Sequence, residues 1–137
     1  MVSFSKNPDV WDASTGTDEL QGAINWEISA GKSGWQDWYY AYHSKSGLTK
    51  SLLMQHVMQD IGFDDVAVVF NVHSASALGW STDVPHSIAI LGFNDSTDKY
   101  FYVDTCGTSC SYGHNTDGYG KWADAADLWA GLIGAVY

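Results

Sequence analysis

The 137-residue sequence carries little positive charge. It contains six lysines and no arginine against sixteen acidic residues, so its formal net charge is −10. Nucleic-acid binding needs clustered cations that neutralise phosphates, and anionic lipid surfaces attract cations in the same way. We therefore expect neither a nucleic-acid partner nor a membrane partner. An acidic balance of this size favours solubility and is compatible with a secreted or salt-adapted protein.

Long apolar segments and signal sequences are also missing. No apolar run approaches the roughly 20 residues that a membrane-spanning helix needs. The first residues, Met1 to Lys6, lack the basic region and the apolar stretch of a signal peptide. If the protein is exported, we expect its signal to lie outside the printed sequence.

Cysteine is scarce, because only Cys106 and Cys110 are present, with three residues between them. A structural zinc site would need two further soft ligands, and nearby His114 offers one at most. A redox motif has two intervening residues instead of three. The spacing favours a small structural disulfide in a loop rich in glycine and serine, which implies an oxidising compartment and hence secretion. We expect no metal and no cofactor.

The chain nevertheless has ample material for a core, since 45% of its residues are apolar and it holds seven tryptophans and eight tyrosines. This composition predicts one folded domain over residues 1–137, with residues 1–14 irregular. Helical spacing of apolar residues predicts helices over 17–31, 49–62 and 123–133, and a β-branched run predicts a buried strand over 66–73. A small-residue loop is expected over 74–84. This order indicates an α+β fold, with helices packed on an antiparallel β-sheet.

Two further strands are predicted on either side of a short polar turn. Residues 85–94 begin with Pro85 and His86, and residues 99–104 end with Asp104. The start of one strand in a hairpin lies beside the end of its partner, so His86 and Asp104 should meet at one edge of the sheet. An imidazole held by a carboxylate is the base and orienting half of a nucleophilic triad.

These strands carry a family resemblance. The segments 68–70 (VVF), 86–95 (HSIAILGFND), 100–105 (YFYVDT) and 127–129 (DLW) resemble the bacterial papain-like cysteine peptidases related to bacteriocin leader-processing domains, which act at double-glycine leaders. The resemblance covers residues 15–137. It implies a papain-like fold, a peptide or protein substrate, His86 as general base and Asp104 as the residue that orients it.

The family's nucleophilic cysteine precedes the histidine, at the start of a helix in a Cys-Gly-Pro context, and this sequence has no cysteine before His86. Cys106 follows the histidine, so the resemblance does not make it the nucleophile. Three interpretations are open. The chain is a fragment that an N-terminal piece or a second chain completes, an inactive relative that binds through its cleft, or a chance likeness in hairpin pattern.

Three other residues are candidates for binding. Trp35 and Trp38 lie in an aromatic segment that could stack on a glycan or grip a peptide, although burial in the core is the favoured interpretation. His73 ends the strand over 66–73 and could face the same cleft as His86, with a hydrogen-bonded strand end as the favoured alternative. These residues define the competing function, a non-catalytic secreted domain that binds peptide or glycan.

Overall fold

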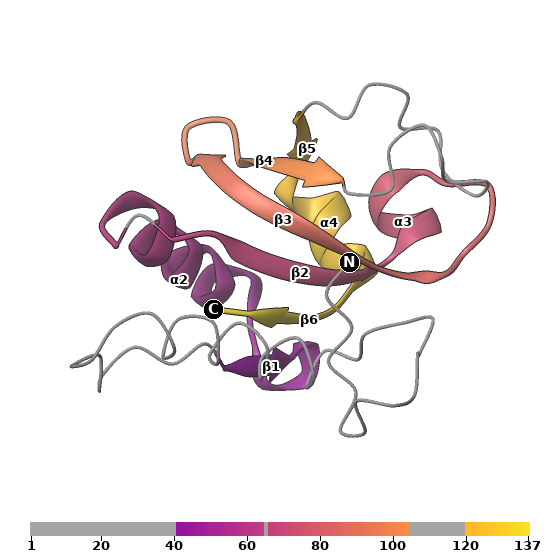
Figure 1. Cartoon of the computed structure of the whole chain (residues 1–137), viewed down its shortest axis with the longest axis horizontal. Coiled ribbons are helices and arrows are strands. Elements are labelled where there is room, and N and C mark those ends of the chain that lie inside the picture. The colour runs from indigo at the N-terminus through magenta and orange to yellow at the C-terminus, as the bar shows by residue number, and fades with distance from the viewer. Residues whose placement is uncertain (1–40, 65, 105–119) are drawn as a thin grey trace, which may run out of the picture. The chain divides into compact units, whose positions relative to one another are not determined.

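The structure is a computed structural model in which residues 41–64, 66–104 and 120–137 are described (Figure 1). The chain divides into two compact units, residues 1–42 with Val136 and residues 43–135 with Tyr137. Nearly all described residues belong to the second unit, which contains the described helices and most of the sheet. The helix predicted over 17–31 lies outside the described residues.

The strands form one sheet in the order β1–β6–β2–β3–β4–β5. Their bounds are β1 Tyr42–Ser44, β2 Val68–His73, β3 Pro85–Asn94, β4 Lys99–Asp104, β5 Lys121–Asp124 and β6 Leu132–Val136. Strands β2 to β5 pair antiparallel with their neighbours. The predicted α+β class is confirmed, and so is the predicted pairing of the strands that carry His86 and Asp104.

Three α-helices accompany the sheet in the described part of the chain: α2 (Lys50–Gly62), α3 (Ser74–Leu78) and α4 (Ala125–Gly131), with a short 3-10 turn at Lys45–Gly47. Helix α2 begins where the sequence predicts, because the Thr49 hydroxyl accepts a hydrogen bond from the Leu52 backbone N–H at 3.1 Å. An N-cap of this kind satisfies one of the free N–H groups of the first turn.

The structure corrects three sequence predictions of secondary structure. The segment expected to be a loop over 74–84 begins with helix α3, which ends at Gly79 in the left-handed conformation (φ 72°). The helix expected over 123–133 is confined to α4, and the chain continues as strand β6. Strand β5 has no counterpart among the strands that the sequence predicts.

One face of the sheet forms the core together with the helices. The buried strand residues alternate along the chain, as one face of a pleated strand requires. They are Val68, Phe70, Val72, Ile88, Ile90, Tyr100 and Tyr102, and the helices add Leu53, Val57, Ala77, Ala125 and Leu128. Helix α4 crosses behind the strands in Figure 1. Within the described ranges no helix is long and apolar enough to span a membrane.

Three rings stack near the end of the chain. The Tyr137 ring contacts the imidazoles of both His43 and His56, at centroid distances of 4.3 Å and 4.5 Å, and the two imidazole centroids are 6.4 Å apart. Burial and then the charge of His56 lower the pKa of His43, whereas burial raises the pKa of the nearby Asp60. Both shifts disfavour the charged form of the side chain concerned. The three rings therefore contribute to the fold mainly by packing.

Candidate functional site

The structure brings His86 and Asp104 together. The distance from His86 Nε2 to Asp104 Oδ1 is 2.7 Å, short enough for a charge-assisted hydrogen bond. The side chain of Asp104 is 1% exposed and that of His86 is 16% exposed. The carboxylate is therefore buried, while part of the imidazole is exposed to solvent.

Strand register explains why the two side chains meet. Asp104 lies directly opposite Ile88, and His86 is two residues further along the same face of β3. The pair is thus diagonal across two neighbouring strands, a separation that long side chains bridge. On the other side of β3, His86 lies opposite Val72 of the central strand β2. Both residues therefore belong to paired strands, His86 near the start of β3 and Asp104 at the end of β4.

A β-bulge in β3 puts the two residues on the same face. Gly92 lies opposite Phe101, but Ile90 lies opposite Tyr102, so Leu91 is an extra residue with no partner. If the register at Gly92 continued along the hairpin, Asp104 would lie opposite Ala89 and project from the face opposite to that of His86. Bulges recur beside active sites because they redirect side chains in this way.

The hydrogen bond determines which imidazole nitrogen is available for chemistry. With Asp104 ionised, its carboxylate only accepts hydrogen bonds, and Nε2 of His86 is then the N–H that donates the hydrogen bond to Oδ1. In the neutral ring, Nδ1 then holds the free lone pair. Among the residues that the structure describes, none forms a hydrogen bond with Nδ1. The pKa of Tyr102 is raised mainly by burial and further by the Asp104 carboxylate.

Sequence reasoning missed two residues at this site, Trp80 and Ser74. The Trp80 ring centroid is 4.7 Å from that of His86, and Trp80 is 6% exposed. Ser74 is fully buried and hydrogen-bonds to the segment that leads into β3. A signal for Trp80 was present, because it is one large aromatic residue in a segment of small and polar ones. The sequence offers no comparable signal for Ser74.

The remaining candidate residues lie apart from this pair or beyond the described ranges. The His73 Nδ1 atom lies 3.2 Å from Asp83 Oδ2, and both side chains are half exposed. His73 is next to Val72, the residue opposite His86, so it starts from the other face of the sheet. The four other candidates, Trp35, Trp38, Cys106 and Cys110, lie outside the described residues, and with them the predicted disulfide.

No group of three or more His, Cys, Asp or Glu side chains is placed to bind a metal ion in the described segments. The chemistry available there is that of a base held by a buried carboxylate. Comparison with models of known protein families finds no family that matches the chain. Comparison with curated proteins finds no match either. Functional inference therefore depends on the geometry of the His86–Asp104 pair.

Proposed function

We propose that this chain is a papain-like, cysteine-peptidase-type domain that supplies the general base and its orienting carboxylate for peptide-bond hydrolysis. The observation that carries the proposal is the 2.7 Å bond between His86 Nε2 and Asp104 Oδ1, which leaves Nδ1 as the basic nitrogen. The sheet with its helices is compatible with a papain-like fold. The thiol nucleophile comes from a segment other than this chain.

Each atom of the pair has a defined task in this reaction. His86 Nδ1 takes the proton from the thiol, and the resulting thiolate attacks the carbonyl carbon of the peptide bond. The imidazolium then returns that proton to the leaving amine. In the second half, Nδ1 takes a proton from the water that attacks the thioester carbonyl. The C–S bond then breaks, and the imidazolium returns the proton to the departing thiolate. Asp104 holds the ring through Nε2 and stabilises each imidazolium that forms.

The test compares this chain with the complete translated product of its gene, using a fluorogenic peptide with Gly-Gly before the scissile bond. We expect thiol-dependent cleavage by the complete product, none by the chain alone, and a loss of at least about 100-fold in His86→Gln. Asp104→Asn should lose activity as well, because its amide cannot stabilise the imidazolium by charge. His56→Gln is the matched control, since it removes another partly buried histidine that has no place in the site.

Two results would overturn the proposal. Activity in the complete product that survives His86→Gln would remove the base from the mechanism. Loss of activity in the double variant Cys106→Ser, Cys110→Ser, with the fold intact, would place the thiol inside this chain. Peptide binding without cleavage, unchanged in His86→Gln, would favour a non-catalytic binding domain instead.

A further inference from the structure

The segment between α3 and β3, residues 79–84, is tied to the fold at its base by Ser74. The backbone N–H of Ser74 donates to the Val84 carbonyl at 3.0 Å, and the Val84 N–H donates to Ser74 Oγ at 2.9 Å. Ser74 Oγ in turn donates to the Thr82 carbonyl at 3.0 Å, and the Trp80 N–H donates to the Ser74 carbonyl at 3.3 Å. One buried serine therefore fixes both ends of the segment.

A second tie lies on the surface of the same segment. Asp83 accepts a hydrogen bond from the Ala75 backbone N–H at 3.1 Å through Oδ1, and its Oδ2 faces His73 at 3.2 Å. Because Asp83 is half exposed, this tie is weaker than the one at Ser74. Together the two ties hold residues 79–84 against α3 and the end of β2.

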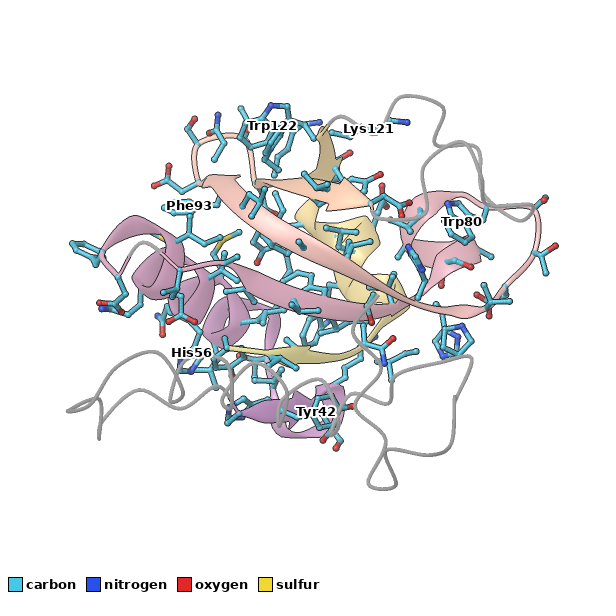
Figure 2. All side chains as sticks on the ribbon, in the orientation of Figure 1. Tyr42, His56, Trp80, Phe93, Lys121 and Trp122 are labelled. Carbon is cyan, nitrogen blue, oxygen red and sulfur yellow. The ribbon has the colours of Figure 1, made fainter. Side chains whose placement is uncertain are left out.

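Residues 79–84 place the Trp80 ring beside that of His86. The two ring centroids are 4.7 Å apart and the ring planes are tilted by 38°. Figure 2 shows Trp80 beside α3, far from the other labelled tryptophan, Trp122 at β5. Trp80 is 6% exposed, so its indole is packed in place and does not move freely in water. The same distance also allows a cation–π contact whenever the imidazole is protonated.

We propose that Trp80 is the positioning residue of the His86 base and that Ser74 holds the segment that carries it. The bond to Asp104 fixes one atom of the imidazole but leaves the ring plane free to turn about that bond. The indole contact removes this freedom, so that Nδ1 points in one direction. The catalytic meaning of this role rests on the proposed function, whereas ring orientation can be measured without any activity.

The experiment is 15N NMR of histidine-labelled protein, with the His86 signals assigned from His86→Gln. At about pH 8.5, where a histidine ring is ordinarily neutral, we expect one tautomer in the unsubstituted chain, with the proton on Nε2 and its exchange with water slowed. In Trp80→Leu we expect a detectable second tautomer and proton exchange faster by about two- to tenfold, the factor that an aromatic contact is worth. Trp80→Phe should restore most of the original spectrum.

Two further variants separate positioning from folding. Trp122→Leu makes the same change at an exposed site and should leave the His86 signals unchanged. Ser74→Ala keeps Trp80 but removes the tie, and should move the His86 signals in the same direction as Trp80→Leu. Original His86 signals in a folded Trp80→Leu would overturn the proposal. If that variant does not fold, original signals in Ser74→Ala would overturn it.

The activity assay distinguishes this inference from the proposed function. In the complete gene product, Trp80→Leu should lower kcat about ten- to hundredfold with a smaller effect on KM, because misplacement of a base acts on the chemical step. A changed NMR spectrum without any peptidase activity would refute the proposed function and leave the positioning role standing. Full activity with a changed spectrum would refute the catalytic value of positioning by Trp80.

Discussion

The hydroxyl group of Tyr100 offers a sharp test of the packing beneath the site. Tyr100 is 1% exposed, and its ring meets that of Phe70 edge-on at a centroid distance of 5.3 Å. In the described part of the chain, its hydroxyl is the buried side-chain polar atom that has no hydrogen-bond partner. A buried polar group without a partner costs about 1–3 kcal/mol.

The substitution Tyr100→Phe removes that group and keeps the ring. The small void left by the oxygen offsets part of the gain, so we expect the free energy of unfolding to rise by about 1 kcal/mol. For a chain of this length, the change corresponds to a melting temperature higher by roughly 3–6 °C.

The same substitution should also make the free energy of unfolding fall less steeply as the pH rises above about 10. Burial raises the pKa of Tyr100, and the charge of Asp98 raises it further. A folded-state pKa above the unfolded-state value means that this contribution to stability is full below about pH 10 and is lost as the pH rises further. Through this group, each pH unit in that window removes up to about 1.4 kcal/mol from the original chain, a loss that Tyr100→Phe does not have. Tyr102 and Tyr137, whose pKa values are also raised, contribute their own losses equally to both proteins.

The assay is urea unfolding at about pH 8 and pH 11, values on either side of the ordinary tyrosine pKa, on the original chain and the variant. Tyr102→Phe is the matched control at the lower pH, because Tyr102 lies two residues along the same strand and its hydroxyl is not among the buried unpaired atoms. Its unfolding free energy should change by less than about 0.5 kcal/mol. If Tyr100→Phe were less stable than the original chain, or if its stability fell as steeply above pH 10, the reasoning would be refuted.

Two other predictions concern the packing of α4 and the ring stack. In Gly131→Ala the new Cβ would lie 2.6 Å from the Cβ of Ala77 in α3, so we expect a loss of about 1–3 kcal/mol in urea unfolding, while Gly47→Ala, with open space around it, should change little. Burial and His56 lower the pKa of His43, so the unfolded chain binds more protons as the pH falls below about 6.5 and stability falls with it. His43→Phe, which keeps a ring in the stack, should show a smaller drop in urea midpoint between about pH 8 and pH 5; an equal drop would contradict the assignment.

The sequence predicted the helices and strands that neighbouring residues alone specify. The hairpin that carries His86 and Asp104 could be read from two strand-like runs and the turn between them, and the start of α2 from its capping Thr49. The five residues of α3 are too few to show a helical period. The apolar run Leu132–Val136 suits a helix end and a strand equally well, and only its place beside β2 in the sheet decides between them.

The meeting of His86 and Asp104 was predicted from the sequence, but the bulge at Leu91 on which it depends was not. Side chains alternate between the two faces of a strand, so inserting one residue reverses the face of everything beyond it. A regular hairpin closed by the same turn would pair Asp104 with Ala89 and separate it from His86 by the thickness of the sheet. Nothing in residues 85–104 identifies Leu91 as the extra residue. With the extra residue at this position, Ile88 and Ile90 lie in the core and Phe93 packs against it. Burial of these apolar side chains thereby accompanies the projection of His86 and Asp104 from the same face.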